Sequence, residues 1–262
     1  MGQMLFEIGC EEIPASYIRP ALASMAENIA KGLDDNHLKH GDVKTFGTPR
    51  RLGFVIEGIP AAQADRREEI AGPRWDVCFK DGQPTPAGMG FAKKIGVNPE
   101  DLQKIDTPKG ECVQAVRQVK GRATAEVLAD ILPGLIAAIP FKKSMHWGAE
   151  PQAFTRPIHW ILALFDGHVI NVEFAGVKSG NRSRGHRFMA PAEFEVHEAE
   201  LFFDHLAQAY VLPFIDEREE FILNEAKRIA AELGGYVKED ISLVSEVANL
   251  LEYPVGLPGR IP

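Results

Sequence analysis

The chain has 262 residues, a formal net charge of -8 and 45% hydrophobic side chains, the composition of an ordinary globular protein with one large domain or two small ones. Its three cysteines are far apart and form no C-x-x-C pair, so neither a disulfide framework nor a zinc site is indicated. No signal peptide is visible and no apolar run reaches the roughly 18 residues of a membrane span, so we expect a cytoplasmic protein without a membrane partner.

The first sixty residues predict a strand, a helix and a pair of strands. Residues 4–8 are a short apolar strand, which ends before Pro14. Apolar residues then recur every three or four positions and predict a helix over about 15–34. Residues 43–46 and 52–56 are expected to pair, with Pro49 in the connection because proline cannot donate to a strand ladder.

The middle of the chain has mixed signals up to residue 110. Asp81-Gly82 indicates a turn, followed by a helix over 88–95. Residues 111–119 read as an extended segment, and a strongly apolar helix begins near Ala123. Pro133 should kink or split this helix because proline removes one of its hydrogen bonds.

The clearest hairpin joins residues 156–165 to residues 168–174 through the Asp166-Gly167 turn, and we expect it in the core. Residues 177–187 are extended but polar, which favours an edge strand or a loop. Helices are predicted over 200–209, from a D-x-x-E capping box at Asp216 to the glycine pair at 234–235, and over about 240–251.

These elements do not alternate strictly as βαβ, so the predicted class is α+β, with mixed or antiparallel sheets packed against helices. Residues 1–189 hold 24 Lys and Arg against 22 Asp and Glu, whereas residues 190–262 hold 5 against 15. We therefore expect an α+β region over 1–190 and an acidic, mainly helical segment over 191–262. An acidic segment is not expected to face a phosphate backbone, so we expect any RNA contact in residues 1–190. The alternative is that the acidic charge of residues 191–262 only keeps the protein soluble.

Motifs for catalysis are missing from the chain. It contains no G-x-x-x-x-G-K-[ST] loop, no G-x-G-x-x-G after a strand and no G-x-S-x-G elbow. His37 and His40 have the spacing of two zinc ligands but lack a third. We therefore assign no catalytic residue, metal site or cofactor to this chain.

Clustered arginines are the main candidates for binding. Guanidinium groups bind phosphate or carboxylate with two hydrogen bonds and stack on bases, so such a cluster indicates either an RNA-facing surface or an ion-pair network that braces the fold. We expect Arg187 to brace the fold and the Arg182 side chain to be exposed. The candidate RNA contacts are Arg50, Arg51, Arg182, Arg184, His186 and Arg187.

The segment RGHRFM at residues 184–189 also resembles the signature of the beta subunit of bacterial tetrameric glycyl-tRNA synthetase. Other segments resemble that family in the same order: FEIGCEEIP at 6–14, TPRRL at 48–52, GP at 72–73, DGQPT at 81–85, GFA at 90–92, KGE at 109–111 and KSMHWG at 143–148. Cys10 stands where threonine is usual in that family, and His146 where arginine is usual. The resemblance extends over residues 4–256.

The resemblance implies the N-terminal region of a glycine–tRNA ligase beta subunit, with the chain cut at 262. In that family an alpha subunit carries the site for glycine, ATP and magnesium, the beta subunit binds tRNA(Gly), and the two form a heterotetramer. The region is expected to serve as scaffold and tRNA contact, with a fold similar to the B3/B4-type domain of phenylalanyl-tRNA synthetase beta chains. A stand-alone RNA-binding module and a hydrolytic tRNA-editing domain remain the alternatives.

Overall fold

The structure is a computed structural model that describes residues 1–108 and 110–259. Its contacts divide the chain into a large unit, formed by Met1–Ala62 and Ala123–Pro262, and an inserted unit, Gln63–Arg122. The sequence did not indicate the inserted unit. No division falls between residues 190 and 191, where the charge changes, and whether 191–262 is a separate functional segment stays a prediction.

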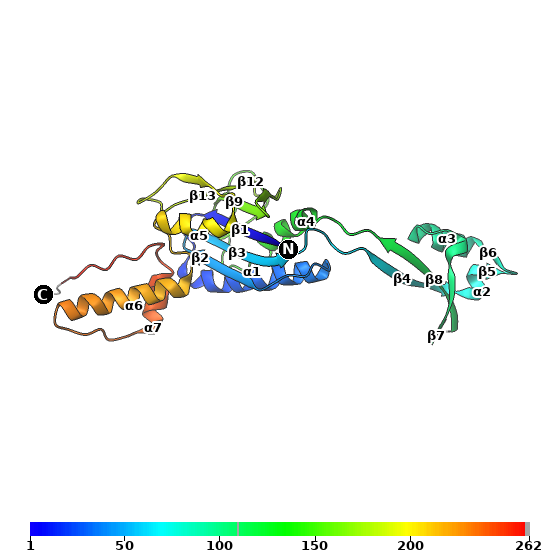
Figure 1. Cartoon of the computed structure of the whole chain (residues 1–262), viewed down its shortest axis with the longest axis horizontal. Helices are drawn as coiled ribbons and strands as arrows, with labels where there is room; N and C mark the ends of the chain where they lie inside the picture. The colour runs from blue at the N-terminus through cyan, green and yellow to red at the C-terminus, as the bar shows by residue number, and fades with distance from the viewer. Residues whose placement is uncertain (109, 260–262) are drawn as a thin grey trace. The chain divides into compact units, whose positions relative to one another are not determined.

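The large unit is built on one mixed sheet with the strand order β11-β12-β9-β1-β3-β2, in which β10 also pairs with β9 (Figure 1). Neighbouring strands are antiparallel except for β12 and β9, which are parallel. The strands are β1 (Gly2–Cys10), β2 (Val43–Thr48), β3 (Arg51–Ile59), β9 (Ile158–Phe165), β10 (His168–Val169), β11 (Glu173–Phe174) and β12 (Val177–Gly180). The predicted α+β class is confirmed.

Helices α1 (Ala15–Asp35) and α4 (Thr124–Ala137) supply much of the core on one face of this sheet. Side chains alternate along a strand, so Met4, Phe6 and Ile8 of β1 point into this core while Leu5 belongs to a second cluster. The apolar stripe predicted for α1 is buried, from Ile18 to Leu33. Helix α4 contains Pro133 but is not split.

The second cluster joins the opposite face of the sheet to α5 (Ala199–Gln208). Phe46 of β2 packs against Phe202 and Phe203, with ring centroids 5.6 and 5.3 Å away. A small antiparallel sheet of β13 (Arg182–Arg184) and β14 (Glu193–Glu195) precedes this helix. Residues 184–189 begin at the end of β13 and lie between this strand and β14.

The acidic part of the chain forms α6 (Ile215–Glu232) and α7 (Ile241–Ala248). Arg218 of α6 is fully buried and donates to the backbone carbonyls of Gly47, Leu212 and Ala248, so one side chain fastens both helices to β2. Burial lowers the pKa of Arg218 to about 10. The capping box predicted at Asp216 is wrong, because Phe214 is the N-cap and Asp216 lies in the first turn.

The inserted unit has its own small core. Strands β4 (Arg66–Arg74), β8 (Gly110–Val119) and β7 (Gln103–Thr107) form an antiparallel sheet, and β5 (Phe79–Lys80) pairs with β6 (Gln83–Pro84) around the predicted Asp81-Gly82 turn. Its helices are α2 (Trp75–Cys78), α3 (Pro86–Ile95) and the 3-10 turn η1 (Pro99–Asp101). Ala92, Leu102 and Ala115 form the centre of this core. Within residues 1–108 and 110–259, no helix has both the length and the apolar character needed to cross a membrane.

Candidate functional site

Glu7 is a fully buried carboxylate on the α5 side of the sheet. Its Oε1 accepts from Arg51 Nη1 at 2.9 Å. Its Oε2 accepts from Trp160 Nε1 and from Ser183 Oγ, both at 2.7 Å. A buried charge is tolerated when it is paired and hydrogen-bonded in this way.

Strand register explains why these groups meet. Gly9 of β1 pairs with Arg51 of β3 on one side and with Trp160 of β9 on the other, and Glu7 lies two residues earlier on the same face. A β-carbon at position 9 would lie 1.9 Å from Cε2 of Trp160. The glycine therefore leaves the space that the indole fills, and the Arg51 guanidinium lies 5.7 Å from the indole centroid.

Arg51 also binds a second carboxylate from the far end of the chain. Its Nε donates to Oε1 of Glu252 at 3.0 Å, and its Nη1 donates to the carbonyl of Arg184 at 3.0 Å. Burial alone would lower the pKa of Arg51, but Glu252 and Glu7 outweigh that effect and raise it. The same arginine thus joins β1, β3, β13 and the segment after α7.

This placement corrects one candidate RNA contact. The Arg51 side chain has no exposed surface, and a phosphate could reach it only by displacing Glu7 or Glu252. We therefore withdraw Arg51 from the RNA-facing set. Its hydrogen bonds join buried parts of the fold, and the sequence did not predict this for the Arg50-Arg51 pair.

The β13–β14 hairpin carries two of the remaining candidates. Arg182 pairs with Glu195 at 2.9 Å and Arg184 pairs with Glu193 at 2.6 Å, and both guanidinium groups are partly exposed. Solvent screens such exposed pairs, and they exchange easily with other partners. Both arginines therefore stay available for a polyanion.

The turn that follows presents a cation beside exposed apolar side chains. The backbone amides of Phe188 and Met189 donate to Nδ1 of His186, which fixes the turn. Arg187 is partly exposed and pairs with Glu11 and with Glu12, both at 3.3 Å; whether it braces the fold stays a prediction. Phe188 is 80% exposed and has no covering element among the described residues.

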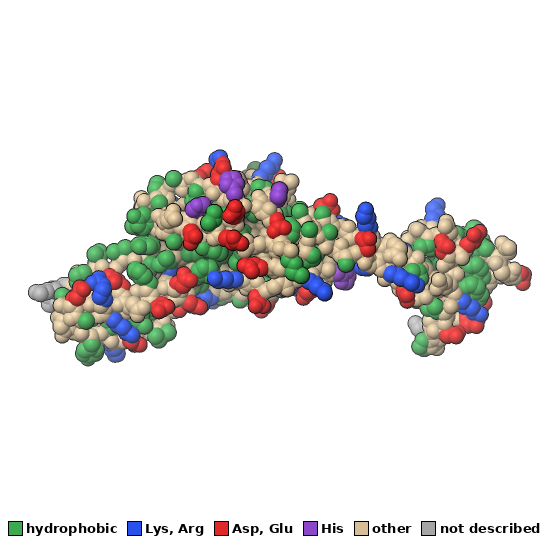
Figure 2. All heavy atoms as spheres, in the orientation of Figure 1, with side chains coloured by type: hydrophobic (Ala, Val, Ile, Leu, Met, Phe, Trp, Pro, Cys, Tyr) green, Lys and Arg blue, Asp and Glu red, His purple; other side chains and the backbone are tan. Residues whose placement is uncertain are grey.

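Arg50 ends in a small hollow beside this turn. The hollow has a volume of about 250 Å³, and Glu11, His159, Arg184 and Arg187 also line it. Three predicted candidates therefore come together, whereas Arg182 and His186 are not among its lining residues. On the face shown in Figure 2, basic and acidic side chains are interspersed, so binding of an anion must depend on local geometry such as this.

Sequence reasoning missed the buried carboxylates of this region. Glu7 lies in the segment FEIGCEEIP, which pointed to the family but not to a role for this residue. Glu252 carried no signal at all, because its partner is 201 positions away. Whether Arg50, Arg182, Arg184, His186 and Arg187 contact RNA stays a prediction.

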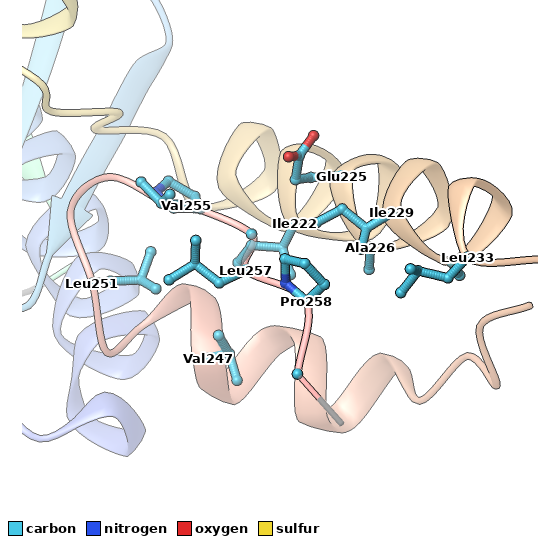
Figure 3. Close-up of a pocket in the computed structure, with 14 residues that line it drawn as sticks. Ile222, Glu225, Ala226, Ile229, Leu233, Val247, Leu251, Val255, Leu257 and Pro258 are labelled. Atoms are coloured by element: carbon cyan, nitrogen blue, oxygen red, sulfur yellow. The ribbon is translucent and has the colours of Figure 1, made fainter. Parts of the chain in front are cut away.

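A second hollow has a different character. It lies between α6, α7 and the last described residues, with a volume of about 410 Å³, and is lined by apolar side chains such as Ile222, Val247 and Leu251 (Figure 3). Among the described residues that line it, Glu225 carries the one charged side chain, and Arg228 pairs with it at 2.6 Å. The hollow therefore offers apolar surface but no set of groups for acid–base chemistry. In the described ranges, no cluster of three or more His, Cys, Asp or Glu side chains is arranged to hold a metal ion.

Three of the segments through which the chain resembles an aminoacyl-tRNA synthetase subunit, 6–14, 48–52 and 184–189, meet around Glu7 and Arg51. Residues 4–262 match the family described as glycyl-tRNA synthetase beta subunit, and the chain belongs to this family. It is 46% identical over 261 residues to the glycine–tRNA ligase beta subunit of Trichlorobacter lovleyi, and 44% identical over 260 residues to that of Geobacter metallireducens. Each alignment covers 99% of this chain and 38% of the relative, so the chain spans well under half the length of the curated relatives it matches. Similarity to the B3/B4-type domain stays a prediction.

Proposed function

We propose that this chain corresponds to the N-terminal region of a glycine–tRNA ligase beta subunit and supports the ATP-dependent charging of tRNA with glycine. The observation that carries the proposal is the family match over residues 4–262. The partners proposed on this basis are an alpha subunit, in a cytoplasmic heterotetramer, and tRNA(Gly). ATP and magnesium are assigned to the alpha subunit, and no catalytic residue is assigned to this chain.

The geometry supports a positioning role for this region. The buried Glu7–Arg51–Glu252 cluster holds the β13–β14 hairpin through Ser183 and the carbonyl of Arg184. This arrangement fixes the following turn, on which Arg187 and Phe188 reach the surface. A fixed cation beside an exposed aromatic ring suits a nucleic acid, because phosphate binds the first and a base stacks on the second.

The test uses the full-length beta subunit that contains this chain. It is co-expressed with the matching alpha subunit, and the complex is isolated by size-exclusion chromatography and assayed for glycylation of tRNA(Gly). We expect co-elution and charging by the complex, with little charging by either subunit alone. Full charging by the alpha subunit in the absence of the beta subunit would contradict the proposal.

A deacylation assay on the same preparation separates positioning from editing. Mischarged tRNA incubated with the beta subunit should decay at the rate seen without protein. Enzyme-dependent hydrolysis would instead assign an editing activity to the beta subunit.

A further inference from the structure

Arg50 of the large unit is nearly buried, yet no carboxylate among the described residues forms an ion pair with it. Its side chain is only 9% exposed, and its Nε is buried without a hydrogen-bond partner. Its backbone is fixed on both sides, since the amide donates to Thr48 Oγ1 at 3.1 Å and the carbonyl accepts from the amide of Cys10 at 2.9 Å. No ion pair or side-chain hydrogen bond joins its guanidinium to another of the described residues.

Burying a guanidinium group without a partner is unfavourable, because the group loses its hydration and gains no bond in return. The charges of the other buried arginines of this unit are compensated: Arg51 has two carboxylates, although its Nη2 makes no hydrogen bond, and Arg218 has three backbone carbonyls. Arg50 lines a hollow that is open to solvent instead. The Arg50 guanidinium is therefore placed to bind an anion that enters the hollow.

The neighbouring charges strengthen this reading. Arg184 and Arg187 line the same hollow, so three guanidinium groups from two segments of the chain face one space. Against them stands Glu11, whose Oε1 lies 2.9 Å from Nε2 of His159 and whose Oε2 lies 3.3 Å from Arg187. Burial would raise the pKa of Glu11, but His159, Arg187 and Arg50 together lower it. The carboxylate is therefore ionised, and its negative charge is compensated by these neighbours.

The partners of the two outer arginines are exposed and exchangeable. Glu193 holds Arg184 at 2.6 Å on a side chain that is 43% exposed. Arg187 is held at 3.3 Å by Glu12, which is 64% exposed, and at the same distance by Glu11, which is 34% exposed. Solvent-exposed pairs of this kind contribute little to stability, and less than a charge-assisted bond to a phosphate. An incoming anion can therefore recruit Arg184 and Arg187 after it has bound Arg50.

We propose that this hollow is a binding site for a single phosphate group, with Arg50 as its principal ligand and Arg187 as the second. Phosphate fits the arrangement because its tetrahedral oxygens can accept from guanidinium groups that approach from different directions. The group can come from an RNA backbone or from a free phosphate compound. The RNA source rests on the proposed function, whereas the phosphate site itself does not.

Phe188 argues for a nucleotide-linked source. Its ring is 80% exposed and lies 5.8 Å from the Arg187 guanidinium, directly beside the hollow's wall. An aromatic ring next to a phosphate ligand offers a stacking surface for the attached base. Inorganic phosphate would use the arginines alone.

The first experiment titrates the 262-residue chain with inorganic phosphate and measures binding by calorimetry or by amide chemical shifts. We expect saturable binding that Arg50→Gln weakens about tenfold, as loss of one charge-assisted bond requires. Arg228→Gln removes an exposed arginine of α6 outside the hollow and serves as the matched control, with no change expected. Equal phosphate affinity in wild type and Arg50→Gln, or no saturable binding, would overturn the proposal.

A second variant protects the test against a folding defect. Glu11→Gln removes the one carboxylate that lines the hollow and leaves the arginines in place. It should tighten phosphate binding severalfold, which a misfolded protein could not do. Unchanged or weaker binding in a folded Glu11→Gln protein would count against the site.

The third experiment identifies the source with the full-length alpha–beta complex. If the RNA backbone supplies the phosphate, Arg50→Gln should weaken tRNA(Gly) binding and reduce the slope of log affinity against log salt by about one unit. If tRNA binding is unchanged while phosphate binding by the chain is lost, the site takes a free phosphate compound, and the proposal stands without the RNA contact. Failure of the complex to charge tRNA would refute the proposed function and leave the phosphate titration unaffected.

Discussion

Gly9 and Trp160 lie side by side on neighbouring strands, and the indole occupies the volume that any side chain at position 9 would need. Three ring atoms of Trp160 lie within 2.1 Å of the position of an ideal β-carbon on Gly9. The same indole donates to Glu7. The small residue and the large one therefore jointly set the position of the buried carboxylate that holds the β13–β14 hairpin.

Gly9→Ala should therefore destabilise the protein. The new methyl group must displace the indole and break its hydrogen bond to Glu7, and overpacking of a core typically costs about 1–3 kcal/mol. Chemical denaturation followed by tryptophan fluorescence measures the change. Gly134→Ala is the matched control, because its β-carbon meets no atom within 4 Å in the interior of α4, and it should be neutral or stabilise by up to about 1 kcal/mol. If Gly9→Ala is as stable as wild type, Trp160 does not fill this space.

Arg51→Met should lower the free energy of unfolding by about 3–5 kcal/mol. The substitution leaves Glu7 and Glu252 buried without their shared cation, and breaking a buried pair on one side has a cost of this size. Arg184→Gln interrupts an exposed pair and should change stability by less than about 1 kcal/mol. Urea titrations of both variants give the comparison. Similar, small losses in both would mean that the buried cluster does not hold the fold.

Lowering the pH should reduce the free energy of unfolding, because it protonates Glu252. Burial would raise the pKa of this carboxyl, but Arg51, the Thr48 hydroxyl and Arg50 together hold it below its ordinary value of 4.5. A carboxyl with a lowered folded pKa stabilises the fold above 4.5, and that contribution is lost as the pH falls through the folded value. Glu252→Gln should therefore be less stable than wild type near pH ~7, and the difference should shrink toward pH ~3.5. A difference that is constant or grows on acidification would contradict this assignment.

Ile161→Ala tests the hairpin that the sequence predicted most clearly. Ile161 is 1% exposed in β9, so truncation should cost about 2–5 kcal/mol. Val169→Ala, in β10 of the same hairpin, truncates a side chain that is 41% exposed. It should lower the free energy of unfolding by much less than Ile161→Ala does. The two variants are compared by thermal melting at one pH. Equal losses would place Ile161 outside the core.

Local pattern predicted much of the large unit. The apolar stripe of α1, the β2–β3 pair and the turn at Asp166-Gly167 each depend on neighbouring residues, and all three are confirmed. Asp166 and Gly167 both have positive φ, as an Asp-Gly hairpin turn requires. The capping box failed because Phe214 is the N-cap of α6; Asp216 lies in the first turn and pairs with Arg19 of α1 at 3.2 Å.

The inserted unit escaped prediction for a related reason. Strand β4 begins Arg-Arg-Glu-Glu, without the alternation of apolar residues that marks a half-buried strand. It is held by β8, more than forty positions later, through pairs such as Glu68 with Arg117 at 2.8 Å. Contacts across that distance are set by the fold and not by the adjacent sequence.

The candidate site was predictable in part. The arginine-rich segments drew attention because of their composition, and three of those arginines do meet at one hollow. Burial could not be inferred: Arg50 and Arg51 are adjacent, yet one guanidinium lines a hollow and the other lies between Glu7 and Glu252. That difference depends on strand phase and on a carboxylate from the far end of the chain.

The most direct test of the central claim, that the turn after β13 faces tRNA, is a cross-link from that turn. Phe188, which is 80% exposed, is replaced by the photoreactive p-benzoylphenylalanine in the full-length beta subunit, in complex with the alpha subunit and labelled tRNA(Gly). The same replacement at Tyr236, which is 90% exposed between α6 and α7, serves as the control. We expect a cross-link from position 188 that unlabelled tRNA(Gly) competes away and that weakens with salt, and none from position 236. A complex that charges tRNA but gives no cross-link from position 188, or gives equal cross-links from both positions, would contradict the account.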